Sequence, residues 1–221
     1  MIINFLDTET SGCNPNTIVQ LSMITVNGPD VLVYDHFIDQ PDITQRNTNI
    51  TGITRNDIWK YGIPEKDVAI HLKSLMIHRP MMVAHNVQFD LSMIFDLLKR
   101  NLGYEIAYEL VSNCKWIDTL TIAKDRWAYC SNMTHKLKDC IKRYNLTDVI
   151  NSHNALDDTK ALFAVFKALA DERNDISKYA NVIGYNPNYP INDAYKFGFI
   201  TYKPQPNNRG FVDANEILPL I

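Results

Sequence analysis

The 221-residue sequence lacks three features that would each point to a particular class of protein. No apolar run approaches the roughly 18 residues of a membrane-spanning helix and no signal peptide precedes the first apolar segment, so we expect a cytoplasmic protein with no membrane contact. The four cysteines include no C-x-x-C pair, which favours reduced thiols. The formal net charge of −3 argues against tight non-specific nucleic-acid binding of the histone kind.

What the sequence does contain is enough apolar material, 46% of residues, for one sizeable core. Alternation and turn residues predict a meander of three strands over residues 2–7, 17–27 and 31–38. A polar loop is expected over 39–53, and later segments predict strands over 81–84 and 105–112. Helical periodicity covers 54–61, the stretch between Pro64 and Pro80, 89–101, 117–126, 134–144 and 154–172. Helices alternating with strands predict an α/β layer architecture.

The last 48 residues differ in composition from the rest of the chain. They hold five of the ten prolines and five of the eleven tyrosines, with little periodicity. We therefore expect a main domain over residues 1–173 and an extended, aromatic-rich extension over 174–221. So many aromatic side chains need a surface to cover, which favours packing on the main domain or on a partner over disorder.

Four acidic residues occupy positions where burial is expected. Asp7 and Glu9 end the first apolar strand and share one of its faces. Asp90 and Asp158 each lie near the start of a predicted helix, on its apolar face. Inward carboxylates are costly unless cations neutralise them, and an all-oxygen site suits Mg²⁺ or Mn²⁺. His153, five residues before Asp158, occupies a position suited to a general base.

Each of these residues alone has an ordinary explanation. Acids at strand ends and helix N-termini are common on protein surfaces, and a single histidine more often has a structural role than a catalytic one. His85 and Asn86 could form no more than a polar turn before a helix. The joint pattern is stronger than its parts, because the order, the spacing and the inward orientation of the acids agree with one another.

The sequence resembles the DEDDh, or DnaQ-like, 3′→5′ exonucleases, a family that includes the proofreading subunit of bacterial replicative DNA polymerase. Three segments carry the resemblance: Asp7-Thr-Glu9-Thr10, His85-Asn86-Val-Gln-Phe89-Asp90 and His153-Asn-Ala-Leu-Asp-Asp158. Weaker matches are Thr51-Gly-Ile-Thr54 and Ile117-Asp118-Thr119-Leu120. The resemblance spans about residues 1–172, and one departure is Thr51, where many relatives have histidine. The extension has no counterpart in the family pattern.

The resemblance implies a ribonuclease H-like fold, with a mixed central sheet flanked by helices in three layers. It also implies phosphodiester hydrolysis with two metal ions. Asp7, Glu9 and Asp158 would hold the first ion, Asp7 and Asp90 the second, and His153 would deprotonate the attacking water. The residues implied in binding the 3′-terminal nucleotide are Thr8, Thr10, His85, Asn86 and Phe89.

The leading hypothesis is a metal-dependent 3′→5′ exonuclease acting on single-stranded or frayed DNA and releasing nucleoside 5′-monophosphates, in proofreading or repair. An exoribonuclease that trims RNA ends is the alternative within the same chemistry, because the discrimination depends on how the site treats a 2′-hydroxyl. A catalytically inactive nucleic-acid-binding or scaffold module is the rival from another class. The extension over 174–221 would dock a DNA polymerase or other partner, or would complete the substrate groove.

Overall fold

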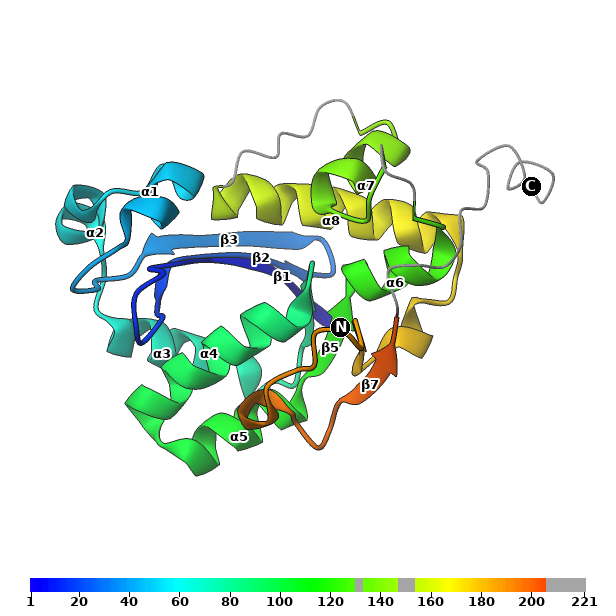
Figure 1. Ribbon diagram of the computed structural model, residues 1–221. Helices are drawn as coiled ribbons and strands as arrows, with labels where there is room; N and C mark the ends of the chain where they lie inside the picture. The colour runs from blue at the N-terminus through cyan, green and yellow to red at the C-terminus, as the bar shows by residue number, and fades with distance from the viewer. Residues whose placement is uncertain (130–132, 147–153, 206–221) are drawn as a thin grey trace.

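The computed structural model describes residues 1–129, 133–146 and 154–205. In this part of the chain a seven-stranded mixed sheet runs in the order β3-β2-β1-β4-β5-β6-β7 (Figure 1). Three strands form an antiparallel meander: β1 (Ile2–Thr10), β2 (Ile18–Asn27) and β3 (Asp30–Phe37). The other four run parallel to β1: β4 (Met81–Ala84), β5 (Lys115–Asp118), β6 (Val182–Tyr185) and β7 (Thr201–Pro204).

Helices cover both faces of the sheet and give the molecule three layers (Figure 1). One face carries α3 (Glu65–Met76), α4 (Val87–Leu102) and α5 (Tyr104–Asn113), and the other carries α6 (Thr119–Arg126), α7 (Leu137–Arg143) and α8 (Ala155–Glu172). Alternation along β1 supplies both cores: Leu6 packs in the cluster of α3 to α5, and Phe5 packs edge-on against Phe163 and Phe166 of α8. The predicted ribonuclease H-like α/β fold is confirmed.

The predicted polar loop over 39–53 contains a short helix, α1 (Gln45–Thr51), which is followed by α2 (Arg55–Tyr61). Gly52, with φ of 75°, ends α1 in the left-handed conformation that glycine adopts without strain. Thr54 begins α2 through a capping box with Asp57. The Thr51–Thr54 segment therefore ends α1 and begins α2.

Two further predictions were wrong in detail. Residues 105–112 belong to helix α5, whose buried positions Ala107, Leu110 and Val111 follow helical spacing rather than strand alternation. The helix predicted from residue 117 begins at Thr119, because Asp118 caps it by accepting the backbone N–H of Leu120. The residues before it, Lys115–Asp118, form the short strand β5, which was not predicted as an element separate from the helix.

The sheet continues beyond residue 173, where the sequence places the end of the main domain. The 3₁₀ helix η1 (Ile176–Tyr179) leads into β6, and η2 (Asp193–Tyr195) precedes β7. The side chains of Ile183, Phe197 and Ile200 are buried in the core on the α3–α5 face. The described part of the extension thus packs on the main domain, which was one of the two expected alternatives; the other was packing on a partner. Its two strands were not predicted. No helix in the described ranges has the length and apolar character needed to cross a bilayer.

Candidate active site

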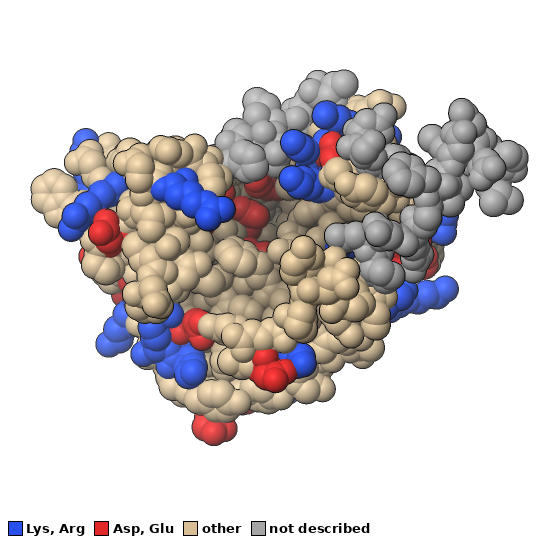
Figure 2. Space-filling model, in the orientation of Figure 1, with Lys and Arg blue, Asp and Glu red and all other residues tan. Residues whose placement is uncertain are grey.

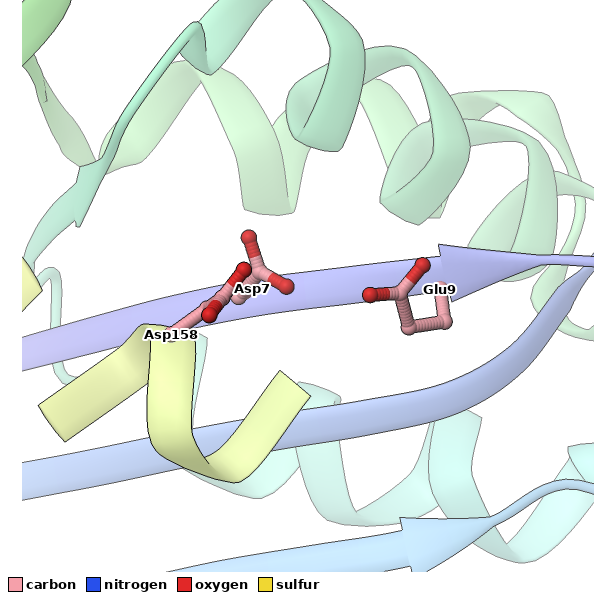
Figure 3. Close-up of side chains that lie close together, drawn as sticks. All are labelled: Asp7, Glu9 and Asp158. Atoms are coloured by element: carbon pink, nitrogen blue, oxygen red, sulfur yellow. The ribbon is translucent and has the colours of Figure 1, made fainter. Parts of the chain in front are cut away.

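Three carboxylates from distant parts of the chain converge near the end of β1 (Figure 3). One oxygen atom from each of Asp7, Glu9 and Asp158 lies within 4.8 Å of the other two. Asp7 and Glu9 face the same side of the sheet because they are two residues apart on a strand, and α8 carries Asp158 to that side. The structure therefore brings together three of the four acids predicted from sequence to bind metal.

The start of α8 fixes the position of Asp158. Asn154 caps the helix, since its Oδ1 accepts the N–H of Leu156 at 3.1 Å. Asp158 follows in the first turn, with 8% of its surface exposed, on the face that also buries Leu162 and Val165. The positive end of the helix dipole favours a carboxylate there by only about 0.3–1 kcal/mol. The dipole alone therefore does not explain why several acids gather at this point.

The fourth predicted acid, Asp90, lies in the first turn of α4 and is 3% exposed. In-register pairing of β1 with β4 ends at Phe5, whereas pairing with β2 continues to Thr10, so beyond Phe5 no strand lies on the β4 side of β1 and the start of α4 lies there instead. The hydroxyl of Thr8 donates a 2.7 Å hydrogen bond to Oδ1 of Asp90. Asp90 is thus anchored to β1 between the two acids of that strand, although it is not one of the three that meet within 4.8 Å.

The electrostatics of these groups reflect negative charge held away from water. Burial, followed by repulsion from Asp90, Glu9 and Asp158, raises the pKa of Asp7 well above its ordinary value. Burial, with repulsion from Asp158 and Asp90, raises the pKa of Glu9 to about 7. Burial likewise raises the pKa of Asp90 to about 7, although the hydrogen bonds from Thr8 oppose the shift. A divalent cation among these groups would reverse the shifts by compensating the charge.

The donor set fits a hard cation. Every ligand atom in the cluster is a carboxylate oxygen, the donor type that suits Mg²⁺ and Mn²⁺, whereas structural zinc sites use thiolate and imidazole. Figure 2 shows acidic side chains at the bottom of a hollow in this face of the molecule, with basic side chains on either side of it. Asp7 and Glu9 are only half-buried, so the cluster is reached from solvent, and a ligand carrying negative charge that entered the hollow would meet basic side chains at its rims.

The residues predicted to bind substrate fall into two groups. Asn86 and Phe89 are exposed near the start of α4, where a ligand in the hollow can reach them. Thr10 is buried, and Asn47 Nδ2 donates to its carbonyl oxygen at 2.7 Å. His85 lies behind the site: its Nδ1 is 3.0 Å from Thr119 Oγ1 and its Nε2 is 2.9 Å from the carbonyl oxygen of His135. Either ring nitrogen could hydrogen-bond to a substrate only after its present hydrogen bond had broken.

Two supporting residues received no role in the sequence analysis. Asp118 is 2% exposed, and its carboxylate accepts the N–H groups of Asn86 and Leu120 and the hydroxyl of Thr121. It therefore joins the turn before α4 to the start of α6. Asn47 of α1 holds the end of β1 through Thr10, and that contact joins segments 37 residues apart. For Asp118 the only signal in the sequence was its place in a segment that weakly matches the family pattern, and for Asn47 there was none.

His153, the predicted general base, lies outside the described residues. Its proposed role therefore rests on the sequence alone. The roles proposed for the other residues stand on the geometry above together with the sequence pattern.

The comparisons with known proteins bear on the family and the fold of this chain. The exonuclease family RNase_T matches residues 5–166, a range that includes all four acids and His153. Among solved structures, Escherichia coli exonuclease I in complex with a dA16 oligonucleotide superposes with a TM-score of 0.68 at 20% identity, covering 80% of this chain and 42% of that one. The cell-death related nuclease 4 (CRN-4) gives a TM-score of 0.60 at 14% identity, with 77% and 64% covered. No match was found among curated proteins.

A third similar structure is a 3′-exonuclease described with a histone mRNA stem-loop, with a TM-score of 0.58 at 14% identity, covering 77% of this chain and 64% of that one. The chain spans less than half the length of exonuclease I, and likeness at these identities concerns the fold. The finer resemblance to a polymerase proofreading subunit stays a prediction. Because the family match extends over most of the sequence, from β1 into α8, the chain belongs to the RNase_T exonuclease family.

Proposed function

We propose that the protein is a metal-dependent 3′→5′ exonuclease that removes nucleoside 5′-monophosphates from single-stranded or frayed DNA. The observation that carries the proposal is the convergence of Asp7, Glu9 and Asp158, with Asp90 beside them, in an open hollow. Such a cluster is unfavourable without cations, and its oxygen donors suit the ions that serve phosphoryl chemistry.

The residues divide the work as follows. Asp7, Glu9 and Asp158 would hold one Mg²⁺ or Mn²⁺ ion, and Asp7 and Asp90 would hold a second. Ions bound there would supply charge neutralisation for the phosphate and a lowered pKa for the attacking water. Thr8 holds the Asp90 carboxylate toward β1, and the raised pKa values of Glu9 and Asp90 mean that the metal-free site retains protons near neutral pH.

His153 accepts the proton of the attacking water in this proposal. It lies in the third family motif, five residues before Asp158, and an imidazole near its ordinary pKa of about 6.5 is partly neutral at physiological pH. The 3′-terminal nucleotide contacts Thr8, Thr10, Asn86 and Phe89, and it contacts His85 once that ring has left one of its present partners.

DNA is the proposed substrate because the structures of exonuclease I that resemble this chain hold DNA oligonucleotides. The second candidate, a 3′→5′ exoribonuclease, is favoured by the likeness to the 3′-exonuclease described with histone mRNA. A proofreading or repair role, with residues 174–221 binding a polymerase, remains a hypothesis. The packing of residues 174–205 on the sheet favours the other suggested role of the extension, completion of the substrate groove.

One experiment tests activity, polarity, sugar preference and metal dependence together. Oligonucleotides of DNA and RNA, labelled at either end, are incubated with the full chain and Mg²⁺, Mn²⁺ or a chelator. We expect stepwise shortening from the 3′ end, faster on DNA than on RNA, and none with the chelator. Asp7→Asn is the matched inactive control. Binding without hydrolysis in every metal would indicate a non-catalytic module and contradict the proposal.

A further inference from the structure

A cavity of about 410 Å³ lies beside the acidic cluster, along the first turns of α4. Its walls are formed by the start of α4, which includes Phe89, by the loop after β1, which includes Asn16, and by the C-terminal segment Ile191–Tyr195. The family match ends at residue 166, so the third wall comes from a part of this chain that the family pattern does not cover.

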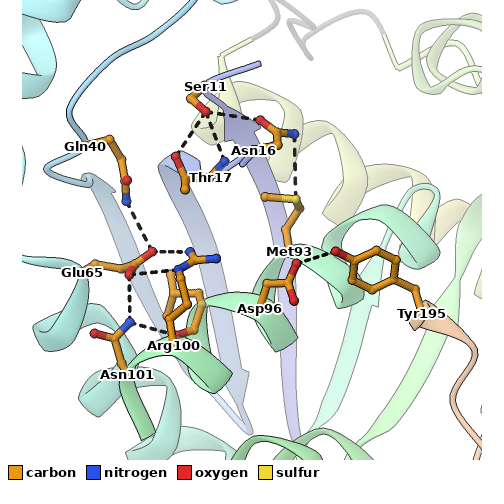
Figure 4. Close-up of polar contacts among 11 residues, drawn as sticks. Ser11, Asn16, Thr17, Gln40, Glu65, Met93, Asp96, Arg100, Asn101 and Tyr195 are labelled. Atoms are coloured by element: carbon orange, nitrogen blue, oxygen red, sulfur yellow. Dashed lines mark hydrogen bonds and ion pairs between the residues drawn. The ribbon is translucent and has the colours of Figure 1, made fainter. Parts of the chain in front are cut away.

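Two of the walls continue the elements that carry the acids. Phe89 directly precedes Asp90 on α4. Asn16 is tied to the end of β1, since its Oδ1 accepts the N–H of Gly12 at 2.8 Å and the hydroxyl of Ser11 at 3.3 Å (Figure 4). A strand bound with its end at the carboxylates therefore passes close to this cavity.

The lining chemistry suits an uncharged, planar and polar group. Among the described residues the lining contains no charged side chain; it offers the amides of Asn16, Asn86, Gln88 and Asn192 and the rings of Phe89 and Tyr195. Phe89 is 41% exposed, so one aromatic ring is available for stacking. Such a surface favours a nucleobase over a phosphate, because a base offers a π-face and hydrogen-bonding edges.

Hydrogen-bonding capacity remains unused in the lining. The Oε1 atom of Gln88 is buried and has no hydrogen-bond partner among the described residues, whereas its Nε2 donates to the carbonyl oxygen of Tyr195 at 2.9 Å. The Nδ2 atom of Asn16 contacts the sulfur of Met93 at 4.0 Å, a weak acceptor. The amide of Asn16 therefore keeps donor capacity for a ligand, and the unsatisfied acceptor of Gln88 lies in a residue that lines the cavity.

The C-terminal wall is held firmly. The hydroxyl of Tyr195 donates to Oδ2 of Asp96 at 2.6 Å (Figure 4), and the ring of Phe197 packs edge-on against Phe95 with centroids 5.2 Å apart. A wall fixed in advance loses little conformational entropy when a ligand binds.

We propose that Ile191–Tyr195 completes a subsite for a nucleobase next to the hydrolysed bond. The inference rests on the proposed exonuclease function. Tyr195 supplies a ring and holds the wall, and Phe89 faces the base from α4.

The test compares Tyr195→Ala with two controls. Tyr195→Phe keeps the ring and loses only the hydrogen bond to Asp96. Tyr189→Ala removes a tyrosine two residues before the segment, which is 76% exposed and does not line the cavity. Binding of a labelled DNA oligonucleotide is measured by fluorescence anisotropy with Ca²⁺ in place of Mg²⁺. An intact oligonucleotide is compared with one that is abasic at its last three positions, and hydrolysis of bis(p-nitrophenyl) phosphate reports the metal site without any base.

We expect Tyr195→Ala to weaken binding of the intact oligonucleotide by about 5- to 150-fold, the loss of one base–aromatic contact. The abasic oligonucleotide should bind wild type and Tyr195→Ala equally, and hydrolysis of the baseless diester should be unchanged. Tyr189→Ala should bind like wild type, and Tyr195→Phe should lose less affinity than Tyr195→Ala, because it keeps the ring and loses only the hydrogen bond that fixes the wall. Unaltered binding by Tyr195→Ala, or equal weakening on the abasic strand, would overturn the subsite. If wild type binds DNA but hydrolyses neither substrate with Mg²⁺ or Mn²⁺, the proposed function fails and the binding comparison still decides the subsite; if it binds no DNA, both fail.

Discussion

Glu9 offers the sharpest physical test of the acidic cluster, because its carboxylate should destabilise the metal-free protein. Burial, with repulsion from Asp158 and Asp90, raises the pKa of Glu9 from 4.5 to about 7. A group with a raised folded-state pKa favours folding below its unfolded pKa, and that contribution is lost as pH rises to the folded value. At about 1.4 kcal/mol per pKa unit, the shift lowers the free energy of unfolding by about 3 kcal/mol at pH 8 and by about 1 kcal/mol at pH 5.

Replacing Glu9 with glutamine removes this titration and keeps the size of the side chain. In chelator, Glu9→Gln should therefore raise the free energy of unfolding by about 3 kcal/mol at pH 8 and about 1 kcal/mol at pH 5. For a chain of this length each kcal/mol moves the melting temperature by about 2–4 °C. Urea titrations at several pH values, followed by circular dichroism, measure the difference directly. Saturating Mg²⁺ should then stabilise wild type more than the variant.

Glu65 provides a control of opposite sign. Burial raises the pKa of its carboxyl, but hydrogen bonds from Arg100 and Asn101 outweigh burial, so the pKa is lowered (Figure 4). Its stabilising contribution is present above the unfolded pKa and is lost in acid. Glu65→Gln should therefore lower stability at pH 8, where Glu9→Gln raises it. If Glu9→Gln is no more stable than wild type at pH 8, or if its effect is the same at every pH, the reasoning about the cluster is wrong.

Four further predictions follow from the site. Asp7→Asn and Asp158→Asn should each abolish hydrolysis with an unchanged circular dichroism spectrum, and normal turnover by either variant would contradict the metal site. The affinity for Mg²⁺, measured by calorimetry, should rise with pH through about 7, because Glu9 and Asp90 must lose protons to bind the ion; a flat profile would show that they are already ionised. His153→Ala should lower the rate by roughly 10²–10⁴-fold, and the wild-type rate should increase through the pH range in which imidazole loses its proton. Asp118→Ala should lower the free energy of unfolding by more than ~2 kcal/mol, because several buried donors lose their acceptor.

The acidic residues could be predicted from the sequence because charged side chains occupy positions at which the surrounding apolar pattern predicts burial. Asp7 and Glu9 follow the apolar run of β1 within the same strand, and Asp158 shares a helix face with apolar residues. Their inward orientation could therefore be predicted from the strand period of 2 and the helix period of 3.6. Asp90 was also read correctly as buried, but its bond to Thr8 depends on β1 extending past β4, which is a tertiary fact. Register between distant strands leaves no trace in a single sequence.

The elements that were misread share a physical cause. Strand β5 is four residues long and is followed at once by a helix, so no alternation separates the two. The strands of the extension, β6 and β7, are equally short, and they gain stability from pairing with the sheet rather than from their own propensity. The roles of Asp118 and Asn47 could not be predicted for a similar reason, because both residues act on segments far away in the sequence.

The pairing of β5 with β6 and of β6 with β7 has a practical consequence for any shortened form of the protein. A chain cut at residue 173 would leave β5 as a bare edge, ready to recruit strands from neighbouring molecules, and would strip Ile183, Phe197 and Ile200 from the interior. Such a fragment is expected to aggregate whether or not its carboxylates are intact. A truncation meant to probe the last residues should therefore stop after Gln205, whose side chain binds back to Thr121 and Asp125 of α6 and so closes the fold.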